Sequence, residues 1–318
     1  MIKISARLAH LGTLLLVIGV LGIVSACYSP SSPFQQLFVT QSGALLIFPT
    51  NANGNVAPTT TISGGNTGFD DLHRTAIAPN GQIYLTDQDA PRIDIFSATA
   101  SGNVAPAATI AGGSTGLSGP SGIAFDATGK LYIANHFGST VTVYAAGASG
   151  NAAPVATISG AGTGLNGPNG LALDATGKIY IGNENANSVT VYAAGASGNA
   201  TPVATISGGN TGLNLPHSLA LDGLARIYVA NGNGNSVTVY AAGANGNATP
   251  VATISGGNTG LDRPNGISLD SIGNIYVANA SGETITVYAA GSNGNVSPIA
   301  TISGGNTGLD FPHGVTVH

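Results

Sequence analysis

The sequence predicts an all-β protein, a six-bladed β-propeller built from four-stranded blades. Two observations lead to this prediction. The chain repeats with a period of 48 residues, which is visible in the tyrosines Tyr132, Tyr180, Tyr228 and Tyr276. The two ends of the repeat array carry complementary parts of one repeat. A ring closed by its own termini explains this arrangement, because it leaves no blade edge unpaired, whereas an open stack has no need of it.

Each repeat contains four short strands. In one repeat they are "GLALD" (170–174), "IYIGN" (179–183), "SVTVY" (188–192) and "PVATIS" (202–207). Each strand is an apolar or alternating run bounded by Gly, Asn, Asp or Pro, and the aspartate after the first strand is expected to cap the following turn. A four-stranded antiparallel unit of this length is typical of a propeller blade.

The chain ends predict how the ring closes. The N-terminal segments "LFVT" (37–40), "ALLIF" (44–48) and "PTTTIS" (58–63) match the second, third and fourth strands of a repeat. The C-terminal segment "PHGVTVH" (312–318) matches the first strand and nothing after it. Together the ends make one blade, and the five whole repeats between them bring the predicted number of blades to six.

Residues 1–26 are predicted to be a lipoprotein signal peptide. Lys3 and Arg7 precede an apolar run that ends at Val24 and is too short to be read safely as a membrane helix. The sequence Val-Ser-Ala-Cys that ends at Cys27 resembles the bacterial lipoprotein box. That resemblance implies acylation of the cysteine, which becomes the new N-terminus.

Cys27 is therefore the expected lipid-attachment site, residues 27–35 the anchor and tether, and residues 36–318 the propeller. Cys27 is also the only cysteine, so no internal disulfide can form. The alternative is an ordinary signal that is cut nearby and leaves a free thiol. We expect an extracytoplasmic protein, at the outer membrane if the host is Gram-negative, because Tyr28 rather than Asp follows the cysteine.

The charge of the mature chain excludes one class of partner. Removing Lys3 and Arg7 leaves 8 − 2 = 6 basic residues against 13 acidic ones, a net charge of −7. The acidic residues are scattered and no basic patch exists, so we expect no nucleic-acid partner. We expect a monomer that contacts a membrane through its lipid and an unidentified protein or small-molecule ligand through its propeller.

The segment "PNGLALDATGKIYIGN" (168–183) resembles the NHL-type propeller repeat, which runs Pro-x-Gly, an apolar stretch, Asp, a glycine turn and a second strand. The resemblance covers the chain from Gln36 onward and implies a propeller. It implies little about function, because propellers include enzymes, binding modules and scaffolds.

The middle residue of each Pro-x-Gly element, or of its counterpart, defines the candidate site. The first strand of a blade lies nearest the axis, so these residues are expected at the mouth of a central channel. We call them the ring positions: His73, Ser121, Asn169, His217, Asn265 and His313. The same face is expected to carry the most varied polar residues of the chain, namely Asp87, Asp89, His136, Glu184 and Glu283.

Two enzyme families on similar propellers suggest a metal at this mouth. Gluconolactonase-like enzymes hold Ca²⁺ and have an Asn-Gly-Leu element like the one that begins at Asn169, but none of the ring positions here is acidic. The amidating lyase holds zinc with three histidines, which implies His73, His217 and His313 as ligands. Zn²⁺ thus fits better than Ca²⁺, although the three histidines are unevenly spaced around the ring. The other interpretation is a polar channel lining bound to water.

The sequence therefore favours a lipid-anchored binding or scaffold module that uses its channel-mouth face. The alternative is a metal-dependent lactonase- or lyase-like enzyme at the same mouth, and a third possibility is a purely structural surface protein. No nucleophile motif appears in a credible context, so no catalytic residue is assigned.

Overall fold

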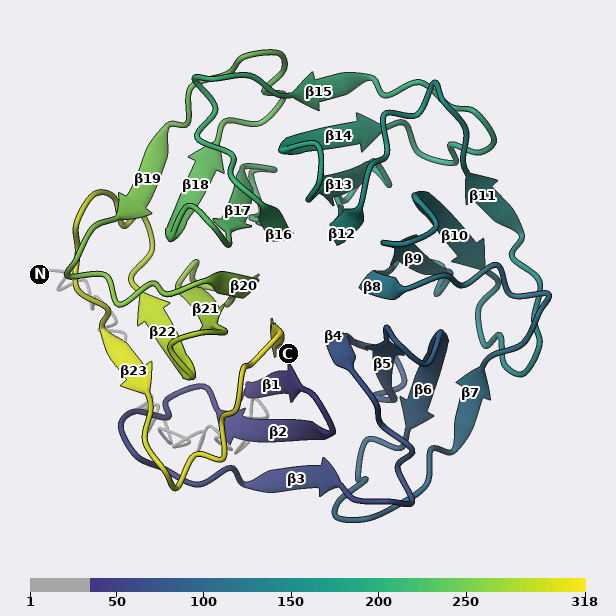
Figure 1. Cartoon of the computed structure of the whole chain (residues 1–318), viewed down its shortest axis with the longest axis horizontal. Coiled ribbons are helices and arrows are strands. Elements are labelled where there is room, and N and C mark those ends of the chain that lie inside the picture. The colour runs from purple at the N-terminus through teal and green to yellow at the C-terminus, as the bar shows by residue number, and fades with distance from the viewer. Residues whose placement is uncertain (1–34) are drawn as a thin grey trace, which may run out of the picture. The chain divides into compact units, whose positions relative to one another are not determined.

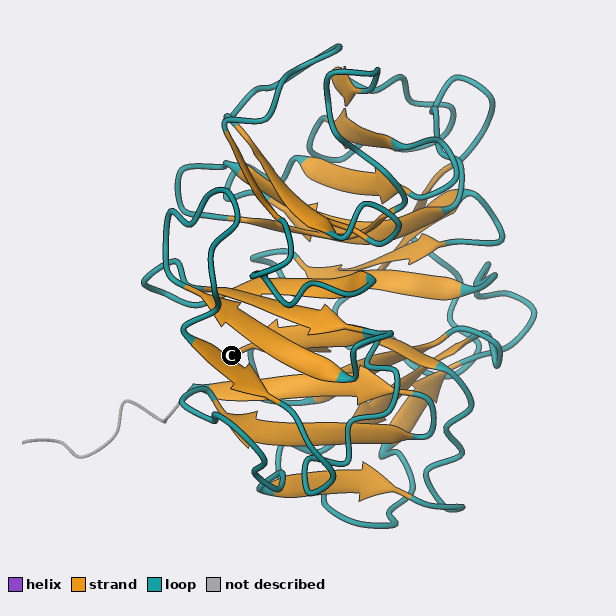
Figure 2. Ribbon diagram, turned by 60° about the vertical axis from the view of Figure 1, so that its left-hand side comes forward, coloured by secondary structure: helices purple, strands orange, loops and turns teal. Residues whose placement is uncertain are grey.

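The computed structural model describes residues 35–318, which form strands and loops and no helix (Figure 2). The predicted signal peptide, Cys27 and most of the tether lie outside the described residues. Within the described part, accordingly, no helix has the length and apolarity needed to cross a membrane.

Six four-stranded antiparallel sheets form a ring, so the predicted six-bladed propeller is confirmed (Figure 1). The innermost strands are β4 (Leu72–Ile77), β8 (Pro120–Phe125), β12 (Pro168–Leu173), β16 (Pro216–Leu221), β20 (Pro264–Leu269) and β24 (Gly314–Val317). The second strands are β1 (Gln36–Gln41), β5 (Ile83–Asp87), β9 (Leu131–Asn135), β13 (Ile179–Asn183), β17 (Ile227–Asn231) and β21 (Ile275–Asn279).

The two outer strands complete each blade. The third strands are β2 (Ala44–Pro49), β6 (Arg92–Phe96), β10 (Thr140–Tyr144), β14 (Ser188–Tyr192), β18 (Ser236–Tyr240) and β22 (Thr284–Tyr288). The outermost strands are β3 (Thr60–Ser63), β7 (Ala108–Ile110), β11 (Ala156–Ile158), β15 (Ala204–Ile206), β19 (Ala252–Ser255) and β23 (Ala300–Ile302). The outermost strands are short, which limits the exposed edge that each blade offers to other chains.

The ring closes as predicted, because β24 pairs with β1 in the order β24-β1-β2-β3. Val39 lies opposite Val315 in this pair. At one end of the pair the Gln36 amide donates to the His318 carbonyl at 2.7 Å, and at the other the His313 amide donates to the Thr40 carbonyl at 2.8 Å. The chain thus enters the propeller at Gln36, on the face opposite to His313.

The apolar core lies between the blades. Each of six buried clusters combines residues from two neighbouring blades; in one, Tyr132 of β9 packs with Leu171 of β12 and Ile181 of β13. The repeated tyrosines belong to these clusters. Tyr144 is fully buried, and its hydroxyl donates to the Thr115 carbonyl at 2.6 Å. Because each blade covers its neighbour, the repeat buries its apolar surface only as part of a ring.

Polar loops join neighbouring blades in an equally regular way. The Asn103 carboxamide oxygen accepts the backbone N–H of Asn66 at 2.8 Å. The same bond recurs around the ring, and the pair formed by Asn55 and Asn306 joins the last whole repeat to the first segment. Within blades, the Asp174 carboxylate accepts the Thr176 amide at 2.8 Å and so caps its turn, as predicted. These near-identical loops therefore have structural roles.

Candidate functional site

The structure gathers the ring positions around the propeller axis, and none of the six residues is more than 9% exposed. All except Ser121 line a single hollow of about 200 Å³, which we call the axial pocket. Its lining consists of Asp71, His73, Gln88, His136, Asn169, Glu184, His217, Arg263, Asn265, Phe311 and His313. Of the other polar residues predicted for this face, His136 and Glu184 reach the pocket. Asp87 is buried, and Asp89 and Glu283 point to solvent.

The guanidinium of Arg74 closes the floor of the axial pocket. Its Nη1 donates to the carbonyls of His313 at 2.7 Å and of His73 at 3.0 Å. Its Nη2 lies within 3.2 Å of the Asn169 side-chain oxygen, the His217 carbonyl and two oxygens of Asn265. These partners come from blades on all sides of the ring, so the guanidinium lies on the axis. Arg74 is not among the residues that the sequence singles out.

The position of Arg74 is normally occupied by a small residue. Its counterparts in the other inner strands are Gly122, Gly170, Ser218, Gly266 and Gly314. A Cβ atom on Gly170 would come within 2.9 Å of the Ser218 backbone, which shows how closely neighbouring inner strands approach. Such crowding favours glycine at this position of the inner strands. The small residues leave space on the axis for one long side chain.

The expectation of an open channel therefore needs correction. Arg74 separates the axial pocket from a second hollow of about 400 Å³ on the opposite side, which is lined along the inner strands by residues such as Ala124, Ala172 and Leu219. Burial lowers the pKa of Arg74 to about 10, and the nearby charge of Glu184 opposes that shift. The guanidinium consequently remains charged at neutral pH, and its hydrogen bonds compensate its loss of water.

Glu184 is the centre of one carboxylate–histidine cluster in the pocket. Its Oε2 accepts the Asn169 amide at 2.7 Å and lies 3.2 Å from His136 Nε2, while its Oε1 lies 3.6 Å from His217 Nε2. Burial alone raises the pKa of Glu184, but the contacts with His136, His217 and Asn169 outweigh burial and hold the pKa well below its usual range. Glu184 is therefore an anion at neutral pH.

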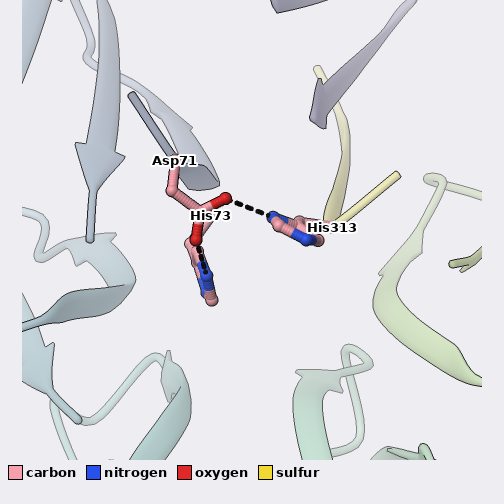
Figure 3. A group of neighbouring side chains, drawn as sticks. All are labelled: Asp71, His73 and His313. Carbon is pink, nitrogen blue, oxygen red and sulfur yellow. Dashed lines mark hydrogen bonds and ion pairs between the residues drawn. The ribbon is translucent and has the colours of Figure 1, made fainter. Parts of the chain in front are cut away.

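Asp71 forms a second cluster with two ring histidines (Figure 3). Its Oδ2 lies 3.1 Å from His73 Nε2, and its Oδ1 lies 3.4 Å from His313 Nδ1. The Asp71 backbone is held by the buried Asp87 carboxylate, which accepts its amide at 3.0 Å. Asp87 in turn pairs with Arg92 at 2.9 Å. The loop that presents Asp71 is thus fixed by a partly buried ion pair.

The pKa values of this second cluster move in one direction. Burial raises the pKa of Asp71, but the hydrogen bond and charge of His73 and the charge of His313 lower it to about 2. Burial lowers the pKa of His73 to about 4, reinforced by the charges of His313 and Arg74 and opposed by Asp71. Burial likewise lowers the pKa of His313. Both histidines are therefore neutral at pH 7.

The structure divides the predicted zinc ligands between the two clusters. One ligand atom each from Asp71, His73 and His313 lies within 4.8 Å of the other two, and within residues 35–318 this is the one such group of three. His217 lies on β16, three blades from β4 in either direction, and contacts Glu184 instead. The three predicted histidines are thus not gathered as one set of ligands.

The position two residues before each ring position could have been recognised as functional from the sequence, because its residue type varies from blade to blade. Its occupants are Asp71, Gly119, Gly167, Leu215, Arg263 and Phe311, so it varies more than its surroundings. Of these, Asp71, Arg263 and Phe311 line the axial pocket. Leu215, Arg263 and Phe311 adopt φ values of 46–57°, a conformation that favours glycine. Strained non-glycine residues of this kind gather at functional sites.

Comparison with known proteins agrees with this architecture. The family model described as Lactonase, 7-bladed beta-propeller matches residues 22–253, so the chain belongs to this family. Its ring nevertheless has six blades rather than seven. No match is found among curated proteins.

Three solved structures illustrate the likeness. A chain of a nidogen/laminin complex has a TM-score of 0.65 at 16% identity, over 89% of this chain and 98% of that one. A protein of unknown function from Bacteroides caccae has a TM-score of 0.65 at 11% identity, with the same coverage. A catalytically inactive virginiamycin B lyase from Staphylococcus aureus, solved with quinupristin, has a TM-score of 0.53 at 11% identity, over 82% and 83%. These similarities show the fold alone.

Replacing Arg74 by serine, the residue at the equivalent position 218, is expected to destabilise the whole ring. The change leaves buried carbonyls and two asparagine side chains without their donor, which costs about 3–5 kcal/mol. At about 2 °C per kcal/mol, the melting temperature should fall by about 6–10 °C. The exposed Lys178→Ser serves as the control, since surface changes stay within about 0.5 kcal/mol. An Arg74→Ser protein that melts like this control would contradict the role of Arg74 on the axis.

The pKa of His73 predicts an acid-sensitive fold. The pKa falls from 6.5 in the unfolded chain to about 4 in the folded one, so the unfolded state binds more protons between these values. The contribution of His73 to the free energy of unfolding is complete above pH 6.5 and is lost as the pH falls towards 4. The loss amounts to about 3 kcal/mol. Melting at pH 7, 5.5 and 4 measures the loss.

The variant His73→Asn places the residue of positions 169 and 265 at position 73 and should lose less stability across the same pH range. His318→Asn is the control and should follow the wild type. Equal pH dependence in all three proteins would show that burial of His73 does not control acid stability.

Proposed function

We propose that this protein is a ligand-binding propeller module, held at an extracytoplasmic membrane surface by a lipid on Cys27. Its ligand is a small polar molecule, or a polar group that projects from a larger partner, and it binds in the axial pocket. The observation that carries this proposal is the closed floor: Arg74 turns the axis into a pocket with a bottom, onto which two carboxylate–histidine clusters face.

The pocket has the size and chemistry of a site for a small polar ligand. Its volume of about 200 Å³ corresponds to about seven water molecules, below the range for drug-sized ligands. The charges of Asp71 and Glu184 are balanced by those of Arg74 and Arg263, since −2 + 2 = 0 when the histidines are neutral. A neutral ligand with several hydroxyl or amide groups fits such a balanced lining, because both donors and acceptors are present.

A metal-dependent lactonase- or lyase-like enzyme is the second candidate. The family match favours a lactonase, and a histidine paired with a carboxylate can act as a general base. A pocket histidine oriented by Glu184 would then serve as the base, because the pKa of Glu184 itself is held too low for that role. The enzyme interpretation predicts turnover of a substrate, whereas the binding module predicts binding without turnover.

Glu184→Gln tests the proposed function, with Glu283→Gln as the matched control. The control removes the same charge from the other glutamate of the chain, which is exposed outside the pocket. Binding is measured by ligand-observed NMR with millimolar monosaccharides, small amides and glucono-δ-lactone. We expect a neutral hydroxylated probe to bind the wild type and the control. Glu184→Gln should bind it at least about tenfold more weakly, because a charge-assisted hydrogen bond contributes about 1.5–3 kcal/mol.

Equal binding by all three proteins, or no binding of any probe, would overturn the assignment of the axial pocket as the ligand site. Hydrolysis of the lactone that is lost in Glu184→Gln, at an unchanged melting temperature, would make the enzyme the better interpretation.

Cys27→Ser tests the anchor. The serine variant cannot be acylated, and without buried acyl chains the protein should leave the membrane fraction and take up no labelled fatty acid. Wild-type protein that takes up no labelled fatty acid, together with a variant that still sediments with membranes, would rule out the lipid on Cys27.

A further inference from the structure

His313 comes from the blade that closes the ring, Asp71 and His73 come from the neighbouring β4 blade, and the three side chains lie together in the lining of the axial pocket (Figure 3). Asp71 and His73 belong to the start of the β4 blade, and His313 directly precedes β24. Whether the three side chains attract or repel one another depends on which of their nitrogen and oxygen atoms carry protons.

The proton of Ser121 can be assigned from its neighbours. The Asn169 side-chain nitrogen donates to Glu184 at 2.7 Å, so its Oδ1 faces Arg74 and Ser121. This oxygen can only accept, and it lies 2.6 Å from Ser121 Oγ. The single hydroxyl proton of Ser121 is therefore donated to Asn169.

The assignment of Ser121 gives His73 a second acceptor besides Asp71. With its proton committed, Ser121 Oγ can only accept from His73 Nδ1, 3.3 Å away. A neutral His73 therefore has one ring proton for two acceptors, and when that proton is on Nδ1, Nε2 presents a lone pair to the Asp71 carboxylate at 3.1 Å. Two acceptors at this distance repel unless a proton or a cation lies between them. A second ring proton would add a buried charge close to Arg74, which is unfavourable.

His313 differs in one respect, because the nitrogen that lies 3.4 Å from Asp71 Oδ1 is Nδ1, which also faces a backbone carbonyl. Its Nδ1 lies 3.0 Å from the Leu72 carbonyl, which can only accept, so Nδ1 donates and Nε2 keeps a lone pair. Each histidine can thus donate one N–H to a fixed acceptor and leave its other nitrogen unprotonated. Histidines that bind metals have this organisation, with the second N–H held by a carbonyl or another acceptor.

We propose that Asp71, His73 and His313 bind one divalent transition-metal ion, of which Zn²⁺ is the representative. Two imidazoles and one carboxylate are suitable ligands for zinc and leave a fourth position open, here towards the pocket. Ca²⁺ is disfavoured because it takes six to eight oxygen ligands, and this group offers one carboxylate. The inference deepens the proposed function and rests on it in one respect, that the ion would contact a ligand bound in the same pocket.

Neighbouring contacts hold the carboxylate of this site in place. Ser42 Oγ donates to Asp71 Oδ1 at 2.8 Å, and Asp87 accepts the Asp71 amide. Such contacts orient a ligand before the metal arrives, and their loss weakens binding by about 10- to 100-fold. The site is therefore built from three ligands and from an outer set that includes Ser42, Ser121 and Asp87.

Calorimetric titration of ZnCl₂ into metal-stripped protein tests the proposal. The full mature chain is used with Cys27→Ser, so that the thiol cannot bind zinc. We expect one zinc ion per chain, and Co²⁺ in its place should give the visible absorption of a histidine-ligated ion. His313→Ala and Asp71→Asn should weaken zinc binding by more than about 100-fold, and Ser121→Ala, which loses the partner of His73, by about tenfold.

His217→Asn is the matched control. His217 lines the same pocket but lies outside the three ligands, so zinc affinity should remain within about twofold of the wild type. Melting temperatures identify any variant that fails to fold, in which case the remaining two variants decide. Absence of zinc binding by the wild type would overturn the site, and so would loss of zinc in His217→Asn.

The two proposals fail separately. If no zinc binds but a neutral probe still binds and requires Glu184, the metal site alone is wrong. If zinc binds as expected and no probe requires Glu184, the metal site stands and the ligand assignment is wrong.

Discussion

The hydrogen bonds of Arg74 on the propeller axis determine what the rest of the site can be. One guanidinium donates to residues of four other blades and so joins blades that otherwise contact only their neighbours. It is charged and removed from water, which is tolerable because carbonyl and amide oxygens surround it. Its presence divides the axis into two hollows and gives the polar one a floor. Both carboxylate–histidine clusters lie above this floor, and Glu184 also offsets its charge.

The regularity of the repeat explains where such special residues can occur. Packing between blades and the asparagine bonds between loops are the same around the ring, so they stabilise the fold without contributing individual chemistry. The departures from the repeat gather near the axis: Arg74 and Glu184 each replace residues that are small, neutral or apolar in other blades, and Asp71 occupies a position that varies from blade to blade. A symmetric scaffold supplies identical strand ends, and a few substitutions among them create an asymmetric pocket.

Membership of a family described as lactonase is compatible with the proposed binding role, because propellers of one family share a scaffold more strictly than an activity. The number of blades differs from the family description, since six sheets form the ring. β24 pairs directly with β1, so the first and last repeats become neighbours and bring His313 beside His73. Closure of the ring thus creates both a stable fold and one of the two clusters.

The periodicity of the sequence by itself determined the number of blades, the four strands of each blade and the closure by the two termini, because a 48-residue repeat with complementary ends fits one ring. It also placed the six ring positions around the axis. Only the tertiary structure decided which of them meet: His73 and His313 become neighbours of Asp71, while His217 faces Glu184. It likewise decided that Arg74 fills the axis. These outcomes depend on loop conformation and on the direction of single side chains. The repeat period describes only the residues that the blades share, whereas the site consists of residues that differ between blades, so the period could not predict their contacts.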